Sequence, residues 1–386
     1  KIKNHNANHK MLLGNIYTQL KKYDQAIKAF RKANLINPKL QINIAVAMNF
    51  YLQKKWKEAS QELKQHIKKF PRAYLAQLLR ANILVRLKKI QEALEETKLT
   101  LKKENRYQWL SRLIRCDIYA RTKQFEKAAK EIDQINANFP YLKGFKNLIK
   151  YCQKEGKFFT PLVQGILLRE IGRPRLALIK TKEATELLAT QPIALYVHGM
   201  TLLNVGQRKE GKEVLHELTK KPDAPIYIFT TLARVYTGEK DFAKAETYYE
   251  KALELRPEST NLLLALGMLY ETQSKVGKAI EHYKKILKMT EKDKKRMGNL
   301  RSVALNNLGW LSLESGEKHR DPNLALKCAE ESFENSRFSW QIADTLGWAY
   351  YYNNDYQKAE RYLLYAKNLK PDYPTIYYHL GKLYLK

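Results

Sequence analysis

Apolar residues recur along this chain at the spacing of an α-helix, in short stretches that are separated by polar turns. The clearest stretch begins at Ile226, where Phe229, Leu232 and Tyr236 fall at relative positions i, i+3 and i+7, on one face of a helix. No stretch shows the strict alternation of apolar and polar residues that indicates a β-strand. The pattern therefore predicts an all-α protein.

A second helical face follows in the same stretch. Ala245, Tyr249 and Ala252 fall at i, i+4 and i+7, and Pro257 follows this helix because proline cannot continue it. Gly238 is predicted to lie in the turn between the two helices. Small residues at the contact let two helices approach closely. The stretch therefore predicts a packed helix pair, whose open apolar face needs a neighbouring pair to cover it.

The same pattern returns 34 residues later in the chain. The positions of Ala233, Tyr236, Ala245 and Tyr249 are repeated by Gly267, Tyr270, Ala279 and Tyr283. This period, with its small residues, spaced aromatic residue and closing proline, resembles the tetratricopeptide repeat (TPR) family over nearly the whole chain. The resemblance implies a right-handed α-solenoid of about ten helix-turn-helix repeats plus a terminal half repeat.

The register of the repeats breaks at one place. Residues 1–140 hold four repeats, residues 141–157 have the pattern of one unpaired linking helix, and residues 158–386 hold six repeats and the half repeat. A lone helix disturbs the stacking of pairs, so we predict a domain boundary there. A repeat whose motif has eroded is the alternative interpretation.

The net charge of the chain is +31, and residues 1–150 carry +22 of it. Much of this excess comes from lysine pairs, mostly at helix ends and inter-helix turns: Lys21-Lys22, Lys54-Lys55, Lys68-Lys69, Lys88-Lys89 and Lys102-Lys103. Two interpretations stay open, a solvated surface in a lysine-rich proteome or a binding surface for an anionic partner. Arg80 and Arg115 replace the usual large apolar residue of the motif, which predicts a polar seam or arginine stems lying along the core.

Residues that could carry chemistry are isolated from one another. Gly206 to Lys212 formally matches GxxxxGK, but no Ser or Thr follows and the flanks are helical, so no phosphate-binding loop is predicted. His5 and His9 stand four residues apart without a third ligand, so no metal site is predicted. The three cysteines form no CxxC motif. We therefore predict a non-enzymatic protein without a cofactor or a metal.

Partner binding is predicted on the concave side of the solenoid. The TPR resemblance implies contacts through motif positions 2, 5, 9, 12 and 13 of the first helix of each repeat. In the N-terminal half these positions give Asn15, Gln19, Met48, Tyr51, Asn82, Arg86, Asp117 and Arg121. In the C-terminal half they give Trp310, Trp348, Tyr351 and Tyr352. The N-terminal set lacks the carboxylate clamp of chaperone-tail receptors, because Met11 stands where that clamp needs lysine. The aromatic set suits peptide side chains or sugar rings, and packing between neighbouring repeats is the alternative.

The C-terminal repeats also resemble a narrower group. Residues 305–310 (LNNLGW), 344–348 (DTLGW) and 374–380 (PTIYYHL) are similar to the closing repeats of bacterial envelope TPR proteins associated with exopolysaccharide secretion and PEP-CTERM sorting. This resemblance implies the bacterial periplasm or envelope, with the cytoplasm as the alternative. The chain opens without methionine, which we interpret as a mature form or an excised fragment. The sequence thus predicts a protein–protein interaction scaffold. The alternative is binding of a polyanion, an acidic polysaccharide or nucleic acid, by the basic N-terminal half.

Overall fold

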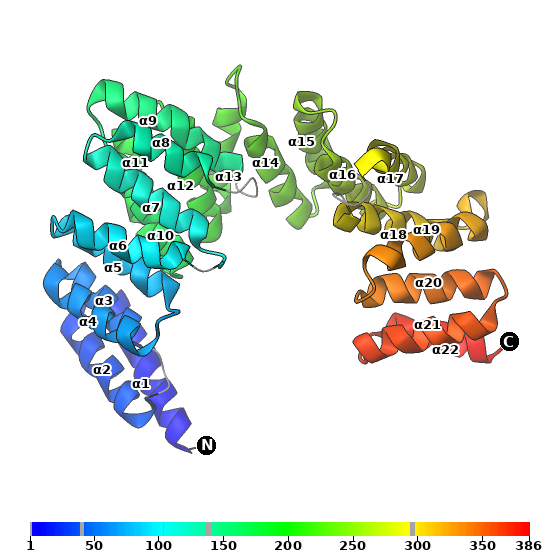
Figure 1. Ribbon diagram of the computed structural model, residues 1–386, viewed down its shortest axis with the longest axis horizontal. Coiled ribbons are helices and arrows are strands. Elements are labelled where there is room, and N and C mark those ends of the chain that lie inside the picture. The colour runs from blue at the N-terminus through cyan, green and yellow to red at the C-terminus, as the bar shows by residue number, and fades with distance from the viewer. Residues whose placement is uncertain (1, 39–41, 103, 136–139, 294–297) are drawn as a thin grey trace. The chain divides into compact units, whose positions relative to one another are not determined.

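The computed structural model describes residues 2–38, 42–102, 104–135, 140–293 and 298–386 of the chain. Within these ranges every regular element is helical and there is no β-strand (Figure 1). The prediction of an all-α protein is confirmed. No helix in the described ranges is both long enough and apolar enough to cross a lipid bilayer.

The internal contacts of the chain group it into two compact units, Lys1–Pro222 (unit 1) and Asp223–Lys386 (unit 2). Unit 1 contains α1 (Ile2–Gln19), α2 (Tyr23–Ile36), α3 (Asn43–Leu52), α4 (Trp56–Lys69), α5 (Tyr74–Arg86), α6 (Ile90–Leu101), α7 (Gln108–Arg121), α8 (Phe125–Asp133), the 3₁₀ turn η1 (Pro140–Lys143), α9 (Gly144–Glu155), α10 (Thr160–Glu170), α11 (Pro174–Leu187), α12 (Pro192–Asn204) and α13 (Arg208–Thr219). Unit 2 contains α14 (Ile226–Gly238), α15 (Phe242–Leu255), α16 (Thr260–Thr272), α17 (Val276–Met289), η2 (Glu291–Asp293), α18 (Gly298–Glu314), η3 (Glu317–His319), α19 (Pro322–Asn335), α20 (Trp340–Tyr352), α21 (Tyr356–Leu369) and α22 (Pro374–Tyr384).

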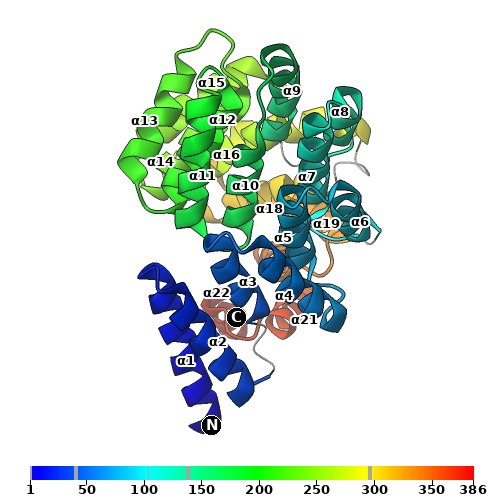
Figure 2. The same ribbon diagram turned by 90° about the vertical axis from the view of Figure 1, so that its left-hand side faces the viewer.

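Consecutive helices pack as pairs that are joined by short turns, such as α1 with α2, α5 with α6 and α20 with α21. The second helix of one pair then contacts the first helix of the next, as α2 contacts α3 and α19 contacts α20. Figure 2 shows the pairs of unit 1 stacked in order along the chain. Each unit is therefore an α-solenoid, as the repeating pattern predicts.

Small residues explain how closely the helices of a pair approach. The second helix of nearly every pair carries an alanine at the contact, and these alanines are fully buried: Ala26, Ala59, Ala93, Ala128, Ala177, Ala245, Ala279, Ala325 and Ala359. The first helix often has glycine opposite. At Gly267, an added Cβ would lie only 2.6 Å from a ring carbon of Tyr283. The spacing of small residues in the sequence thus corresponds to the helix–helix contact itself.

Two ion pairs form the polar seam that Arg80 and Arg115 predict, one of them buried and the other made by the half-buried Arg115. Arg80 is paired with Glu96, and both side chains are buried between α5 and α6. Arg115 Nε donates a hydrogen bond of 2.6 Å to Glu131 Oε1, while its Nη1 reaches Thr97 Oγ1 on α6 at 3.4 Å. The arginines therefore have carboxylate partners inside the stack, which a buried charge requires.

Helix α9 stands apart from the pairs. It ends at Gly156, whose φ of 63° is left-handed and favours glycine. α9 contacts α8 and α12, whereas α10 contacts α5, α7 and α12. α10 therefore follows α7 in the line of first helices, and α9 lies beside that line. The domain boundary that the sequence predicts at residues 141–157 falls inside unit 1 and stays a prediction.

Candidate functional site

The inner surface of unit 1 is largely occupied by its own helices. Helix α10 lies against α5 and α7, and several of the predicted groove residues on α3, α5 and α7 are buried. Met48, Tyr51, Asn82 and Asp117 are exposed by only 1%, 7%, 3% and 2%. Gln19 and Arg121 are exposed, and Asn15 and Arg86 are half-buried. Four of these eight residues are therefore buried, and four remain at least partly accessible to a partner.

Helix α10 makes polar contacts with the covered residues. Arg86 Nη2 donates a hydrogen bond of 2.8 Å to Gln164 Oε1 of α10, and the Arg86 guanidinium lies 4.9 Å from the centre of the Trp56 ring. Thr160 Oγ1, at the start of α10, donates a hydrogen bond of 2.8 Å to Asp117 Oδ1. Arg86 and Asp117 therefore hold the solenoid together, and a partner has no access to Asp117 in this arrangement.

The burial of Asp117 makes the stability of unit 1 depend on pH. Burial raises the pKa of this carboxyl to about 6 from its ordinary 3.8, against the opposing effects of the Thr160 hydrogen bond and of Arg121 and Arg86. The folded protein then keeps the proton to a higher pH than the unfolded chain. Stability should therefore fall by about 2 kcal/mol between pH 4 and pH 7 because of this residue.

Asp117→Asn is expected to remove that loss, because the amide oxygen still accepts the Thr160 hydrogen bond and carries no charge. Thermal unfolding of both proteins between pH 4 and pH 7 measures the effect. The variant should be similar to wild type near pH 4 and clearly more stable near pH 7. Parallel pH profiles for the two proteins would show that Asp117 titrates normally.

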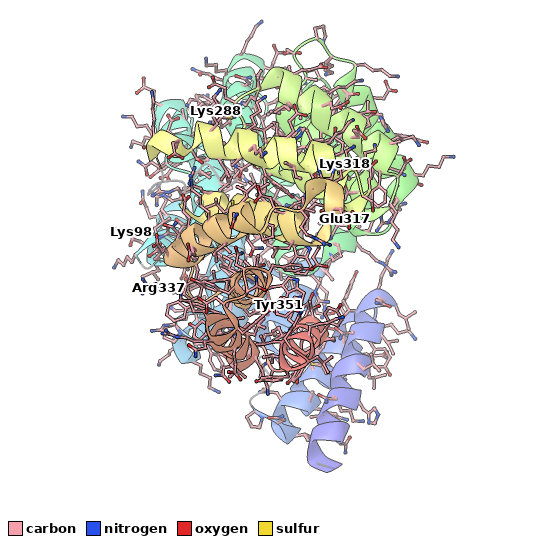
Figure 3. All side chains as sticks on the ribbon, turned by 90° about the vertical axis from the view of Figure 1, so that its right-hand side faces the viewer. Lys98, Lys288, Glu317, Lys318, Arg337 and Tyr351 are labelled. Carbon is pink, nitrogen blue, oxygen red and sulfur yellow. The ribbon has the colours of Figure 1, made fainter. Side chains whose placement is uncertain are left out.

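The predicted aromatic residues of unit 2 come together on successive first helices. We define the aromatic cluster as Trp310 of α18, Trp348, Tyr351 and Tyr352 of α20, and Tyr378 and His379 of α22. The Trp348 ring lies 4.5 Å from Tyr351, 5.1 Å from Tyr352 and 4.1 Å from His379, measured between ring centres. Trp310 lies 5.8 Å from His379. All four residues predicted here belong to one group of neighbouring rings, and Figure 3 labels Tyr351 among the side chains of unit 2.

Trp348 and His379 form the fixed base of the aromatic cluster. Trp348 is 3% exposed, and its Nε1 donates a hydrogen bond of 2.6 Å to Glu314 Oε1. His379 is 1% exposed, and its Nδ1 lies at hydrogen-bond distance, 2.9 Å, from Asp344 Oδ1. Trp348 thus packs between repeats, which was the alternative interpretation of the sequence.

The other rings of the aromatic cluster are accessible to a partner. Trp310, Tyr351 and Tyr352 are half-buried, and Tyr378 is 57% exposed. The Arg320 guanidinium lies 5.6 Å from the centre of the Tyr352 ring and adds a positive charge beside it. This surface therefore combines accessible aromatic faces with polar groups at its edge.

Sequence reasoning missed part of this surface. Asp344, Glu314 and Tyr378 lie at motif positions 5, 13 and 5 of their helices, so the rule that gave Trp310 and Trp348 would also have given them. His379 lies outside those positions, and its partnership with Asp344 follows from the packing of α22 against α20. No pattern in the sequence indicates that pair.

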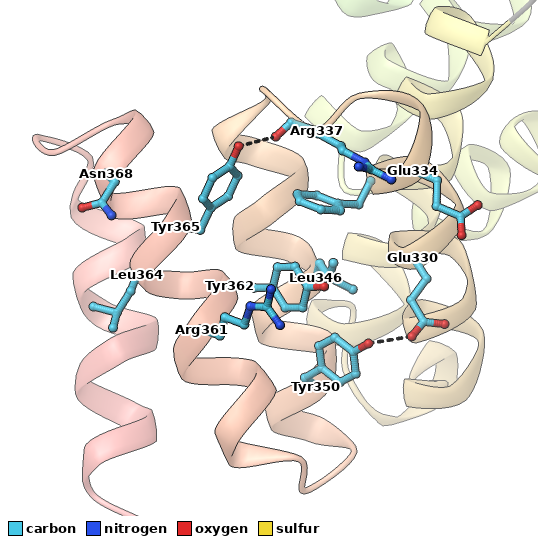
Figure 4. Close-up of a pocket in the computed structure, with 11 residues that line it drawn as sticks. Glu330, Glu334, Arg337, Leu346, Tyr350, Arg361, Tyr362, Leu364, Tyr365 and Asn368 are labelled. Carbon is cyan, nitrogen blue, oxygen red and sulfur yellow. Dashed lines mark hydrogen bonds between the residues drawn. The ribbon is translucent and has the colours of Figure 1, made fainter.

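A groove lies between second helices α19 and α21 of unit 2, with first helix α20 at its base. It is a groove of about 900 Å³ whose wall includes Phe333, Tyr350, Tyr362 and Tyr365 (Figure 4). The Tyr350 hydroxyl donates a hydrogen bond of 2.7 Å to Glu330 at its rim. The sequence analysis did not predict this groove, because its residues occupy motif positions that the family resemblance does not associate with binding.

The structure shows no group of potential metal ligands in the part of the chain that it describes. No group of three His, Cys, Asp or Glu side chains converges there, although the side chain of His5 lies outside the described part. Gly206 lies in the α12–α13 turn with φ 89°, and no strand precedes it in the described chain. Cys116, Cys152 and Cys328 are free and buried, and burial raises the pKa of the Cys152 thiol to about 12 and of Cys328 to about 11. Such thiols are poor nucleophiles at neutral pH.

Comparison with known families decides what these helix pairs are. Three models described as tetratricopeptide repeat match residues 10–40, 47–103 and 224–292. The chain contains tetratricopeptide repeats. The matches fall in both units of this TPR protein, and the matched families are repeat families and not catalytic ones.

Among curated proteins, the photosystem I assembly protein Ycf3 of Cyanophora paradoxa is 31% identical over 97 residues, which are 24% of this TPR protein and 51% of that one. The chain thus spans about half the length of this relative. Among solved structures, yeast Tom70 is similar with a TM-score of 0.41 and 14% identity, covering 99% of this chain and 96% of that one. The APC/C hetero-tetramer Cut9-Hcn1 is similar with a TM-score of 0.43 and 11% identity, covering 98% of this chain and 96% of that one. BtubC from P. vanneervenii is similar with a TM-score of 0.43 and 19% identity, covering 53% of this chain and 90% of that one.

Proposed function

We propose that this TPR protein is a non-enzymatic scaffold that binds a protein or peptide partner through the aromatic cluster of unit 2. The supporting observation is the contact of rings from α18, α20 and α22 across three successive first helices. Tyrosine and tryptophan bury much area and lose little side-chain entropy on binding. A cluster already held by Trp348 and His379 needs little further ordering when a partner arrives.

The chemistry of the surface describes the partner. Tyr351, Tyr352 and Tyr378 offer ring faces and hydroxyls, and Arg320 offers a guanidinium beside Tyr352. An apolar or aromatic side chain of the partner would lie on the rings, and a neighbouring carboxylate would pair with Arg320. This combination is typical of a peptide segment with an aromatic anchor.

The wider role that we propose is assembly of other proteins. The curated relative is named an assembly protein, which is the same class of role. The location in a bacterial envelope complex, such as one for exopolysaccharide export, rests on the resemblance of residues 305–310, 344–348 and 374–380 to closing repeats of envelope TPR proteins.

Replacing both Tyr351 and Tyr352 by alanine should weaken partner binding at least about tenfold, because each buried aromatic anchor contributes about 2 kcal/mol. The partner is first identified by affinity capture with the full chain, and its affinity is then measured by calorimetry. Trp310 and Trp348 lie in the cluster, so a change in intrinsic fluorescence should accompany binding.

The matched control replaces Tyr248 and Tyr365, two half-buried tyrosines of the second helices α15 and α21. This variant loses the same two phenol groups away from the aromatic cluster and should bind as wild type does. Equal losses in the two variants, or wild-type affinity after removal of Tyr351 and Tyr352, would refute binding at the cluster. Turnover of any captured molecule would refute the non-enzymatic assignment.

A further inference from the structure

Successive turns of unit 1 carry adjacent lysines. The turns within the first three helix pairs contain Lys21-Lys22, Lys54-Lys55 and Lys88-Lys89, and all six side chains are exposed. We call these six residues the lysine edge. Because consecutive helices of the stack run in opposite directions, the turns within pairs lie along the same edge of unit 1. The lysine edge is therefore a row of paired positive charges.

The first lysine of each pair adopts a backbone conformation that disfavours it. Lys21, Lys54 and Lys88 have φ of 58°, 59° and 60°, in the left-handed region where a side chain costs stability. Of the later turns of the same unit, one again has lysine there, Lys123 with φ 60°, and two use glycine, at Gly172 and Gly206. Lysine at these positions is thus retained against the local conformational preference.

The second lysine of each pair stands where a helix usually has a capping side chain. Lys22, Lys55 and Lys89 are the N-cap residues of α2, α4 and α6, and none makes a side-chain cap. Unit 2 uses aspartate at the equivalent position of three helices, and Asp241, Asp321 and Asp355 accept the backbone N–H of Lys244, Leu324 and Lys358. A cation at the start of a helix also opposes the helix dipole.

Unit 2 shows that a left-handed lysine and an uncapped helix start need not occur together. Lys240 is left-handed with φ 60°, but Asp241 follows it and caps α15. The three double-lysine turns of unit 1 lack both the glycine and the capping side chain, as do the turns at Lys123-Gln124 and Ser274-Lys275, but only the lysine pairs place two adjacent lysine charges in such a turn. Places where a sequence breaks local rules without local compensation are commonly functional.

Most of the charge at the lysine edge is not neutralised within the protein. Lys55 Nζ lies 3.8 Å from Asp24 Oδ1, and Lys89 Nζ lies 2.6 Å from Glu92 Oε1. Among the described residues, no carboxylate pairs with Lys21, Lys22, Lys54 or Lys88. The uncompensated ammonium groups favour an anionic partner.

We propose that the lysine edge binds an extended acidic segment, rich in Asp and Glu, of a partner protein. Neighbouring turns lie one to two helix spacings apart, roughly 10–20 Å. An extended peptide covers that distance with about three to six residues, so its carboxylates can reach successive lysine pairs. Lysine suits this occupant, because its flexible point charge needs no fixed bidentate geometry.

A nucleic acid fits the edge less well. Single strands need aromatic platforms for their bases, and Trp56, which follows the second pair, is already in contact with Arg86 and Tyr51 at 4.9 Å each. Specific duplex readout needs side chains that converge on base edges, whereas these lysines are spread along a row. The lysine edge is independent of the aromatic cluster, so one can fail without the other.

The test measures binding of poly-L-glutamate to the full chain at physiological salt. Replacing Lys22, Lys55 and Lys89 together by aspartate should weaken the Kd at least about tenfold, because three charge contacts become repulsive. The same substitutions install the caps that unit 2 uses, so the melting temperature should stay or rise. Lost binding in this variant is then not caused by unfolding.

The control variant replaces Lys28, Lys64 and Lys98 by aspartate. These exposed lysines belong to the second helices of the same three pairs, and the change in net charge is identical (Lys98 is labelled in Figure 3). Its Kd for poly-L-glutamate should change less than about threefold. Equal weakening in both variants, or no weakening in the first, overturns the proposal. Tighter binding of oligouridylate or of phosphatidylserine vesicles than of poly-L-glutamate overturns the choice of an acidic peptide.

Discussion

Gly267→Leu is expected to lower the free energy of unfolding of unit 2 by about 3 kcal/mol. Even the first side-chain carbon at this position would lie 2.6 Å and 2.9 Å from two ring carbons of Tyr283. Tyr283 cannot move aside easily, because its ring is fully buried and its hydroxyl accepts a hydrogen bond of 3.1 Å from Asn307. The variant must therefore separate α16 from α17.

Gly277→Leu is the matched control for this prediction. Gly277 belongs to the same helix pair, but no atom lies within 4 Å of an added Cβ. This variant should melt at or slightly above the wild-type temperature, because leucine is a better helix former than glycine. Calorimetry or circular dichroism of the full chain gives both values. Equal melting temperatures for the two variants would show that the glycine contact does not set the spacing of the pair.

Removal of the Arg301 side chain is the second large effect that we expect. Arg301 is 4% exposed and links α18 to two neighbouring elements and to α19. Its Nε donates to Glu331 at 2.7 Å, its Nη1 to the Leu287 carbonyl at 2.7 Å, and its Nη2 to Glu291 at 2.8 Å. Arg301→Ala leaves these acceptors without their donor and should cost about 3–5 kcal/mol.

Two further variants identify the cause of that loss. Arg301→Lys keeps the charge, but its single ammonium nitrogen cannot reach all three acceptors, which contact three different nitrogens of the guanidinium. This variant should therefore recover only part of the stability. Arg256→Ala removes an exposed arginine of unit 2 and should change the melting temperature little. A wild-type melting temperature for Arg301→Ala would show that the ion-pair network contributes nothing to unit 2.

The sequence predicted the helix pairs well because their determinants are local. Ala245 and Ala279 mark the helix contact directly, and Gly156 ends α9 through its own backbone conformation. The inner surface of unit 1 was harder to predict. The motif shows which side of a first helix faces inward, but not how strongly the stack curves. Contact of α10 with both α5 and α7 depends on that curvature and covers Asn82 and Asp117.

The sequence predicted only part of the candidate site in unit 2, because motif positions are local but side-chain geometry is not. The motif positions that face inward include those of Trp310, Trp348, Tyr351 and Tyr352. The repeat pattern alone was therefore enough to predict that these four residues lie near one another. The buried pair of His379 with Asp344 requires a side-chain geometry that spacing alone does not contain. The charge of the lysine pairs was evident in the sequence, but their left-handed and uncapped conformations were not.

The hydrogen bond between Arg86 of α5 and Gln164 of α10 joins residues 78 positions apart. The rings of Trp310 of α18 and His379 of α22 are also in contact, although the pair α20–α21 lies between these helices in the chain. In an ideal linear array each pair touches only its immediate neighbours, and stability is close to a sum of nearest-neighbour terms. Contacts that skip a pair add coupling beyond that sum. Each unit should therefore lose its connected pairs together in one cooperative step, instead of fraying pair by pair from an end.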